Sequence, residues 1–395
     1  MKCHEARVLS LMILLIVVGA VHAEDLSKGP YGQWSRGPGP GTDFFPIAVW
    51  LQSPANAARY RAAGINVYVG LWRGPTEEQL TQLKNADMRV ICSQNAVALK
   101  RLDDSTIVGW MHGDEPDNAQ SLGSGQGYGP PIPPAKIVED YERIRAADPS
   151  RPILLNLGQG VAWDGWYGRG VRTNHPEDYP EYIQGCDIAS FDIYPATHSN
   201  PQIAGNLWYV AHGVERLTSW GQGRKIVWNC IECTQIQSDD RKPTPEQVRC
   251  EVWMSIVHGS TGLIYFVHEW KPTFNESALL SDSAMYDAVT RINHRIAALA
   301  AVLNSPTVPD GAKVQPGNPE VPIATLVKRH GGAVYLFAVA MRSGQTRAKL
   351  AIQGLSGRHT VEVLDEDRTL EAADGAFEDD FRPWDVHLYR LAATN

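Results

Sequence analysis

The chain has 395 residues, 43% of them hydrophobic, and a formal net charge of −8. This length exceeds one ordinary domain and is compatible with a large barrel joined to a small module. The mildly acidic charge, without a long block of one sign, argues against nucleic acid and against anionic membrane surfaces, both of which attract basic patches.

The first 23 residues predict an export signal. Lys2 and Arg7 provide a charged start, residues 9–21 form an apolar run, and Val21-His22-Ala23 places small residues before a cleavage site at Glu24. A retained membrane anchor is the alternative, but the apolar run is short for a spanning helix. We therefore expect a secreted or periplasmic protein with no membrane association after cleavage.

Removal of this segment leaves an odd number of cysteines, so at least one thiol stays free in a monomer. Zinc binding and thioredoxin-type redox chemistry have little support, because the one C-x-x-C pair has no second pair after it. A single disulfide, for example between Cys233 and Cys250, and a set of buried unpaired thiols are both compatible with the sequence. The five cysteines are Cys92, Cys186, Cys230, Cys233 and Cys250.

Residues 24–43 are rich in Gly and Pro and predict an irregular lead-in. From residue 44, short apolar runs alternate with helical segments up to residue 303, which predicts a (β/α)8 barrel with a parallel sheet. An open doubly wound sheet is the alternative, but the Gly-rich turn typical after its first strand is missing. The predicted strands are 45–50, 65–72, 88–93, 107–116, 152–157, 186–194, 225–233 and 262–270, and the predicted helices are 56–63, 76–86, 134–147, 206–220, 245–258 and 283–303.

Residues 304–320 are dense in Pro and Gly and predict a linker. Residues 321–395 lack helical periodicity and predict a small all-β module of the sandwich type. Its predicted strands are 323–328, 334–341, 348–352, 360–364 and 386–391.

Active sites of (β/α)8 barrels lie at the carboxyl ends of the strands. Carboxylates, amides and aromatic residues gather at these ends in this chain, where a merely polar loop would carry scattered Lys and Ser. The resulting substrate-binding and catalytic candidates are Trp72, Arg73, Gln94, His112, Asp114, Glu115, Asn156, Asp192, Tyr194, Glu232, His268, Glu269 and Trp270.

Among these candidates, Glu115 and Glu232 form the preferred catalytic pair. They end the fourth and seventh predicted strands, which face each other across an eight-stranded barrel. Glycoside hydrolysis with retention uses two carboxyl groups about 5–5.5 Å apart, one protonated and one ionised. Negative charge on Glu232 and Asp114 would favour a protonated Glu115.

On these residues the chain resembles the large clan of retaining (β/α)8 glycoside hydrolases that includes cellulases, mannanases and β-galactosidases, over residues 44–303. In that clan the fourth strand commonly ends Asn-Glu-Pro, which Asp114-Glu115-Pro116 matches except at its first position. The resemblance implies that Glu115 is the acid/base, Glu232 the nucleophile, Tyr194 a contact of the nucleophile and Trp270 a stacking surface for sugar. It implies cleavage of β-glycosidic bonds in a poly- or oligosaccharide without cofactor or metal.

Asp114 departs from the clan, which has Asn at this position. An ionised Asp side chain only accepts hydrogen bonds, whereas the Asn amide also donates them. Side chains alternate along a strand, so only one of Asp114 and Glu115 is expected to point inward. Glu269 is the alternative nucleophile. His112 and His268 could contact sugar hydroxyls, and the alternative is that each is a hydrogen-bonded histidine with a structural role. The loop aromatic residues Trp163, Trp166 and Tyr167 are further candidates for stacking on sugar.

Two other function classes remain open. One is a non-catalytic carbohydrate-binding protein on a degenerate barrel, which the departure at Asp114 keeps open. The other is a metal-dependent hydrolase, which would need a ligand cluster such as His-x-His on the first strand. The segment F-P-I-A-V-W at 45–50 has none.

Overall fold

A computed structural model describes residues 29–39, 41–238, 240–270 and 273–392. The predicted export signal lies outside these residues. Within the described ranges, no helix is both long enough and apolar enough to cross a bilayer.

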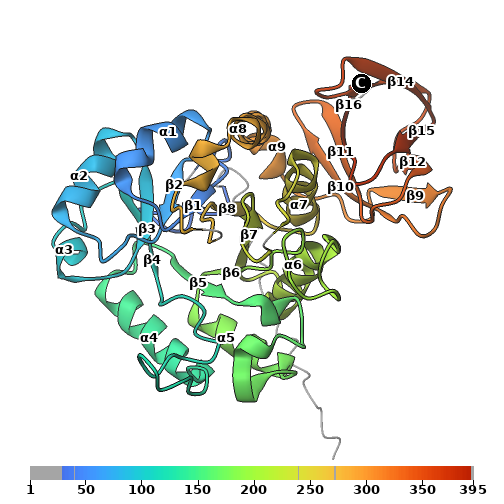
Figure 1. Cartoon of the computed structure of the whole chain (residues 1–395). Helices are drawn as coiled ribbons and strands as arrows, with labels where there is room; N and C mark the ends of the chain where they lie inside the picture. The colour runs from blue at the N-terminus through green and yellow to red at the C-terminus, as the bar shows by residue number, and fades with distance from the viewer. Residues whose placement is uncertain (1–28, 40, 239, 271–272, 393–395) are drawn as a thin grey trace, which may run out of the picture.

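The first part of the chain forms a closed barrel of eight parallel strands, which confirms the predicted fold class (Figure 1). Each strand pairs with the next in sequence, and β8 closes the ring on β1 with Ile47 opposite Leu263. The open doubly wound sheet is thereby excluded. The strands are β1 (Ile47–Trp50), β2 (Val67–Val69), β3 (Arg89–Cys92), β4 (Ile107–Met111), β5 (Ile153–Leu157), β6 (Ile188–Phe191), β7 (Ile226–Glu232) and β8 (Gly262–Phe266).

Helices surround the barrel and follow the predicted pattern, with two short additions, α3 between β3 and β4 and α5 between β5 and β6. Both additions have only four residues. Asn95 caps the first of them, α3, by accepting hydrogen bonds from the amides of Val97 and Ala98. Thr76 and Thr244 start two longer helices with capping boxes. The helices are α1 (Ala57–Ala62), α2 (Glu77–Asn85), α3 (Ala96–Leu99), α4 (Pro134–Ala147), α5 (Tyr179–Tyr182), α6 (Trp208–Gly221), α7 (Pro245–Val257), α8 (Ser283–Ala298) and α9 (Ala300–Leu303), with short 3-10 turns between some of them.

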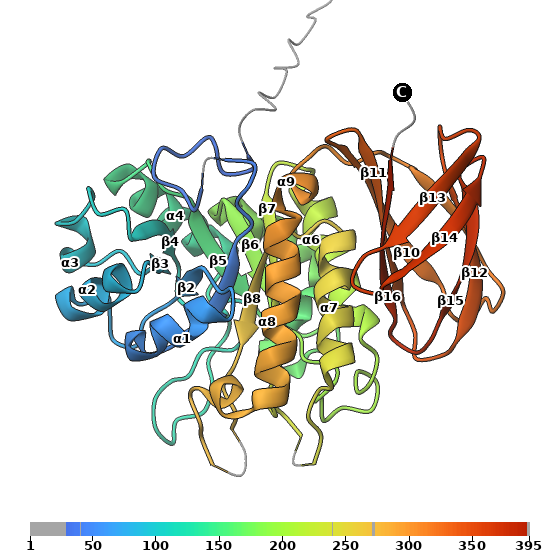
Figure 2. The same cartoon turned by 90° about the horizontal axis from the view of Figure 1, so that it is seen from above.

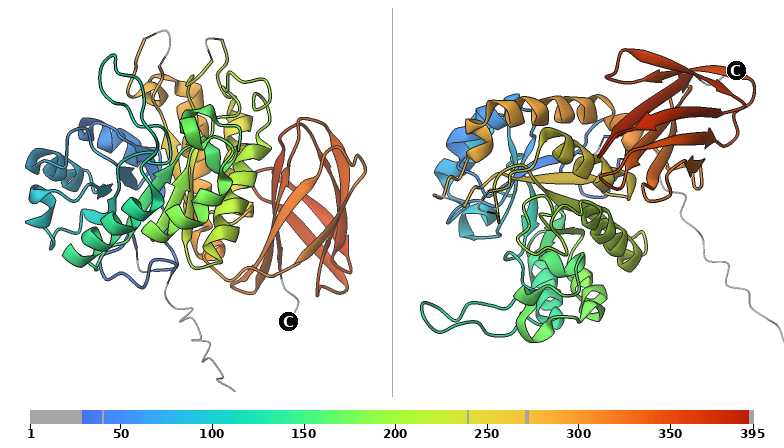
Figure 3. Two further views of the ribbon diagram at one scale, coloured as in Figure 1. Left: turned by 90° about the horizontal axis from the view of Figure 1, so that it is seen from below. Right: turned by 45° about the vertical axis from the view of Figure 1, so that its right-hand side comes forward.

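The lead-in closes one end of the barrel. The Tyr31 hydroxyl donates to the carbonyl of Thr261 at 2.9 Å and accepts from Trp228 Nε1 at 2.7 Å, and Tyr31 is fully buried with the barrel interior. Figure 2 shows this segment crossing the barrel end opposite the long strand-end loops. The end at which the strands finish therefore stays open for a site, and the loop around residues 117–133 projects there (Figure 3).

The C-terminal part is one eight-stranded antiparallel sheet in the order β10-β11-β16-β13-β14-β15-β12-β9, around its own apolar core. Three of its strands differ from the prediction. β9 lies inside the segment predicted as a linker, and β14 and β15 form a hairpin that was not predicted. β14 and β15 carry several charged residues and β9 ends in Pro, so pairing with neighbouring strands decides their conformation. The strands are β9 (Ala312–Pro316), β10 (Ile323–His330), β11 (Ala333–Ala340), β12 (Thr346–Ile352), β13 (Arg358–Val363), β14 (Arg368–Ala373), β15 (Ala376–Phe381) and β16 (Val386–Ala392).

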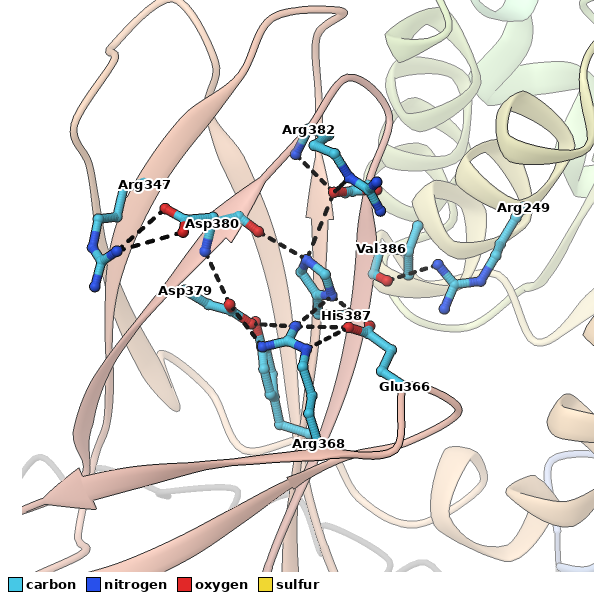
Figure 4. Close-up of polar contacts among 11 residues, drawn as sticks. Arg249, Arg347, Glu366, Arg368, Asp379, Asp380, Arg382, Val386 and His387 are labelled. Atoms are coloured by element: carbon cyan, nitrogen blue, oxygen red, sulfur yellow. Dashed lines mark hydrogen bonds and ion pairs between the residues drawn. The ribbon is translucent and has the colours of Figure 1, made fainter.

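Helix α7 joins this β domain to the barrel. The Trp253 ring stacks on Phe337 of β11 with centroids 5.2 Å apart, and Arg249 Nη1 donates to the carbonyl of Val386 at 2.7 Å. Figure 4 shows the Arg249 contact beside an ionic network in which His387 contacts Glu366. One face of α7 thus packs on the β domain while the helix also covers β7.

The five cysteines expected in the mature chain are all buried and unpaired. The disulfide between Cys233 and Cys250 does not form. The Cys250 thiol instead points toward the carbonyl of Ala340, and the Cys233 thiol toward that of Phe266. These residues behave as small apolar side chains of the core.

Candidate active site

A pocket of about 400 Å³ opens at the carboxyl ends of the barrel strands. Its wall combines carboxylates and amides with several large aromatic rings, a composition typical of ligand pockets in barrels. The lining residues are Trp50, Asp114, Glu115, Asn156, Gln159, Trp166, Asp192, Tyr194, Cys230, Ile236, Gln237, Phe266 and Trp270.

Both acids after β4 line this pocket, although strict alternation would allow only one of them to do so. Glu115 has a φ of 42°, in the left-handed region, and this turn brings Asp114 and Glu115 to the same side. The amide of Glu115 donates to the carbonyl of Asn156 at 3.2 Å, and its carbonyl accepts from the amide of Asn118 at 3.1 Å. A non-glycine residue in this region costs about 1–3 kcal/mol and persists where the surroundings fix it, often at functional sites.

The Glu115 carboxyl is hydrogen-bonded to the carboxyl of Asp192, which follows β6. Desolvation, the charges of Asp192 and Asp114 and this hydrogen bond raise the pKa of Glu115 well above its ordinary value. Desolvation and the charge of Asp114 raise the pKa of Asp192 to about 7, and the contact with Glu115 opposes this rise. Glu115 is therefore the protonated member of the pair and Asp192 the ionised one.

Asp114 and Asn156 form a second polar contact beside this pair. Asn156 Nδ2 donates to Asp114 Oδ1 at 3.0 Å, and its Oδ1 accepts from the Ser190 hydroxyl at 2.8 Å. Asp114 keeps an exposed face, yet the pocket walls desolvate its carboxyl and the nearby Asp117 adds negative charge, so its pKa rises to about 6. The pocket thus holds three acids with raised pKa values, and Glu115 is the one that keeps its proton to the highest pH.

Glu232 does not meet Glu115, contrary to the pairing expected from the sequence. Its carboxylate is fully buried and lies outside the pocket lining. It accepts hydrogen bonds from the Ala196 amide at 2.6 Å, the Thr197 amide at 3.0 Å and the Thr197 hydroxyl at 2.7 Å. It also contacts the carboxyl of Glu251 on α7, on the outside of the barrel. These partners turn Glu232 away from the pocket, and Asp192 takes its place beside Glu115.

Two further candidates point away from the pocket. His112 Nε2 contacts the carbonyl of Gly185 at 2.8 Å, and the ring is buried on the outer side of β4, the side that Trp110 also faces. Gln94 Nε2 donates to the carbonyl of Ile144 at the end of α4. Alternation places these side chains toward the helices, so His112 and Gln94 have the structural role.

The β2 and β8 loops form an aromatic rim beside the pocket. The exposed Trp72 ring stacks on the buried His268 ring, with centroids 5.9 Å apart and an angle of 17°. His268 also meets the edge of Trp270, which lines the pocket. Glu276 Oε1 accepts from Trp72 Nε1 at 3.0 Å and so fixes the ring. Trp72 therefore lies at the rim, with His268 as its support.

Arg73 and Glu269 do not line the pocket. Arg73 is exposed, and Glu269 is half-buried with its backbone paired to Asn275. Glu269, the alternative nucleophile, therefore lies outside the group of acids that line the pocket.

Several lining residues were not predicted as site residues, although Trp166 was a candidate for stacking. Trp50, Cys230 and Phe266 are the last inward-facing positions of apolar strands, and their sequences read as ordinary core. Gln159 and Gln237 come from loops whose course is not encoded locally. Side chains alternate between the two faces of a strand, so counting back from the end of each strand could have identified Trp50 and Phe266 as facing inward.

Among the residues that the structure describes, no group of three or more His, Cys, Asp or Glu side chains is arranged to hold a metal ion.

Comparison with solved structures finds the same fold in several carbohydrate-active proteins. An α-amylase from Anoxybacillus aligns with a TM-score of 0.55 and 10% identity, over 90% of this chain and 99% of its own. An α-amylase from Geobacillus thermoleovorans, solved with acarbose, aligns with a TM-score of 0.54 and 10% identity, over 90% and 99%. A putative α-galactosidase from Bacteroides fragilis aligns with a TM-score of 0.53 and 11% identity, over 89% and 80%.

No protein-family model and no curated protein matches the sequence. At these identities the solved structures establish the fold, which is the barrel fold that the resemblance to glycoside hydrolases implied.

Proposed function

We propose that the protein is a glycoside hydrolase in which Glu115 is the general acid and base and Asp192 is the nucleophile. The observation that carries this proposal is the hydrogen-bonded Glu115–Asp192 pair at the carboxyl ends of β4 and β6, in a pocket walled by aromatic rings. One acid is held protonated and the other ionised, and glycoside hydrolysis needs this division of roles.

The reaction follows from the two protonation states. Glu115 gives its proton to the leaving glycosidic oxygen while the Asp192 carboxylate attacks the anomeric carbon, and a glycosyl ester forms as the C–O bond breaks. Glu115, now ionised, takes a proton from water, whose oxygen displaces Asp192 from the sugar. The hydrogen-bonded carboxyls lie closer together than the about 5–5.5 Å of a retaining pair, so the bound sugar has to separate them on entering the pocket. The retaining spacing needs a smaller separation than the about 6.5–9.5 Å of an inverting pair, which favours retention.

Asp114 and Asn156 provide the polar contacts for the bound sugar. Asp114 holds the position at which the related clan uses Asn, and its free oxygen can accept a hydrogen bond from a sugar hydroxyl. Asn156 orients Asp114 through the 3.0 Å contact. Because Asp114 is also negative, it favours the positive charge that develops on the sugar ring in the transition state.

The aromatic residues support an oligosaccharide or polysaccharide as substrate. Trp166 and Trp270 line the pocket, and the exposed Trp72 continues this surface beyond it. An aromatic face packs well on the C–H groups of a sugar ring. Trp72 is held from behind by His268 and Glu276, so its conformational cost on binding is low. A sugar chain would thus extend from the pocket across the rim.

The finer points of the proposal are the linkage and the location. The sequence resemblance supports β-glycosidic bonds, and the solved structures of similar fold include α-amylases, so a substrate panel needs both anomers. The apolar segment within residues 1–23 supports export and release as a secreted or periplasmic protein. N-terminal sequencing of the exported protein, with Glu24 as the expected first residue, tests the location.

The direct test is hydrolysis of a panel of α- and β-linked oligosaccharides by the wild type, Glu115→Gln and Asp192→Asn. Release of sugar by the wild type alone, with retained anomeric configuration in the first product, supports the proposal. Binding without release across the panel would favour a non-catalytic carbohydrate-binding protein. Activity that disappears with a chelator and returns with a divalent ion would favour a metal-dependent hydrolase.

A further inference from the structure

Glu232 is an acid that the proposed reaction does not use, although it ends a barrel strand. Its side chain is fully buried and takes three hydrogen bonds from two consecutive residues, Ala196 and Thr197. Two of the donors are backbone amides at 2.6 and 3.0 Å, so the carboxylate fixes the main chain of this loop. An ionised carboxylate makes stronger hydrogen bonds than a neutral group at the same distances.

Glu251, on α7, lies behind Glu232 and is also fully buried. Its carboxyl contacts that of Glu232, and within the described part of the chain neither of its oxygens has an N–H or hydroxyl partner. Two buried carboxyls in contact must share a proton, because two adjacent charges repel. Glu232 has three donors and Glu251 has none, so Glu251 keeps the proton and donates to Glu232.

The loop that Glu232 holds also carries the catalytic side of the pocket. Asp192 and Tyr194 line the pocket and come two to five positions before Ala196 and Thr197 in sequence. The next residue, His198, contacts Gln159 through Nε2 and Oε1 at 2.8 Å, and Gln159 is another lining residue. Segment 192–198 therefore faces the pocket with its catalytic and lining residues. It is held in place by the hydrogen bonds from residues 196 and 197 to Glu232.

We propose that Glu232, supported by a neutral Glu251, is a positioning residue that fixes segment 192–198 and thereby sets the orientation of Asp192 against Glu115. This inference rests on the proposed role of Asp192. The carboxylate touches neither the pocket nor Glu115, and its lone pairs are occupied by the loop. Its contribution to the reaction therefore passes through the main chain of residues 196 and 197.

Amide hydrogen exchange in the full-length protein tests the attachment without any substrate. In Glu232→Gln, the amides of Ala196 and Thr197 lose an ionic acceptor, and we expect their exchange to accelerate by on the order of tenfold or more. Strand β6 should keep its protection. Thr197→Val removes the hydroxyl donor alone and should give a smaller acceleration, and it serves if Glu232→Gln does not fold. Unchanged exchange at both amides in folded variants would overturn the proposal.

A pair of substitutions at Glu251 tests its supporting role. Glu251→Leu removes the proton donor, and we expect faster exchange at residues 196 and 197 and a lower kcat with little change in KM. Glu251→Gln keeps a donor to Glu232 and should restore both values toward the wild type. Glu246→Leu, at an exposed site in the first turn of the same helix, is the matched control. Equal behaviour of the Leu and Gln variants would contradict the donor role.

Azide separates this proposal from the proposed function. A nucleophile removed by substitution to Ala is replaced by azide, which displaces the leaving group once and forms a glycosyl azide of inverted configuration. We expect this product with Asp192→Ala and not with Glu232→Ala. Glu232→Ala should have a lower kcat, and azide should not restore its activity. Rescue of Glu232→Ala would make Glu232 the nucleophile and overturn the positioning role. Full activity of Asp192→Asn together with faster exchange in Glu232→Gln would reject the proposed function and leave the loop attachment intact.

Discussion

Two pairs of acids lie at the same end of the barrel and differ in what surrounds them. Glu115 and Asp192 line an aromatic pocket, and Glu232 and Glu251 are sealed between β7, α7 and the loop after β6. Each pair shares a proton through a carboxyl–carboxyl hydrogen bond, and burial raises the pKa values of all four acids. The pKa values of the two pairs are therefore shifted in the same direction and by the same main cause.

The difference lies in the donors and in access. Glu232 has three donors from the chain, and the pair has no opening to a ligand. The Glu115–Asp192 pair has an open pocket in front of it. A raised pKa alone does not identify a catalytic acid, since structural networks also shift pKa values. The reacting pair is distinguished from the positioning pair by its access to the pocket and by carboxyl oxygens that have no hydrogen-bond donor from the described part of the chain.

The largest expected effect is on catalysis at the pocket pair. We expect Glu115→Gln and Asp192→Asn each to lower kcat/KM by about 10³-fold or more, because acid–base and nucleophilic roles contribute on this scale. Far-UV circular dichroism should show an unchanged fold. Asp148→Asn, at a buried acid that pairs with Arg151 and lies outside the pocket lining, is a comparison for stability alone. Loss of less than tenfold in Asp192→Asn would assign the nucleophile elsewhere.

The sealed pair should make the stability of the protein depend on pH. The pKa of Glu251 is raised from 4.5 by desolvation and the Glu232 charge, so its contribution to stability is full below about pH 4.5 and is lost as pH rises toward the folded-state value. Each such group changes the free energy of unfolding by up to about 1.4 kcal/mol per pH unit. Glu251→Gln should therefore flatten the decline of Tm between pH 5 and pH 7 that calorimetry records. An unchanged slope would mean that Glu251 does not stay protonated in the folded protein.

Asp114 is expected to tune the pocket pair through its charge. Its negative charge raises the pKa of both Glu115 and Asp192. The acidic limb of the kcat/KM profile reports ionisation of Asp192, so we expect this limb near pH 7 in the wild type. Asp114→Asn should move the whole bell-shaped profile to lower pH. A shift to higher pH, or none, would contradict the proposed order of protonation.

The smallest expected effect is at the rim. Trp72→Ala should raise KM for long oligosaccharides by about 3–10-fold, equivalent to about 0.5–1.5 kcal/mol of stacking energy. The shortest hydrolysed substrate should be unaffected, because it does not reach Trp72. Arg73→Ala next to it is the matched control. An equal rise in KM for short and long substrates would show that Trp72 acts on the pocket itself.

The barrel could be predicted because its strands are short β-branched and aromatic runs ending at Gly, Pro or polar residues. Asp114, Glu115, Asn156, Asp192, Tyr194 and Trp270 were also predicted as site residues, because each follows or ends such a run. The orientation of Glu232 could not be predicted. It depends on the amides of a loop 35 and 36 positions away and on Glu251 on the next helix.

Other differences arise from local backbone conformation and pairing. The left-handed φ at Glu115 overrides the alternation of side chains along the strand. Sequence rules predict a positive φ mainly at glycine, so they do not predict one at this glutamate. His112 follows alternation, and the buried Trp110 two positions earlier was the available signal. In the β domain, β9 and β14 are polar segments whose strand conformation depends on partners far along the chain.

Covalent trapping tests the central claim most directly. A 2-deoxy-2-fluoro glycosyl fluoride of the hydrolysed sugar slows the second step, so the glycosyl ester accumulates and peptide mass spectrometry identifies the labelled acid. Our account predicts the label on Asp192 and an unlabelled Glu232. A label on Glu232, with Asp192 unmodified, would contradict it.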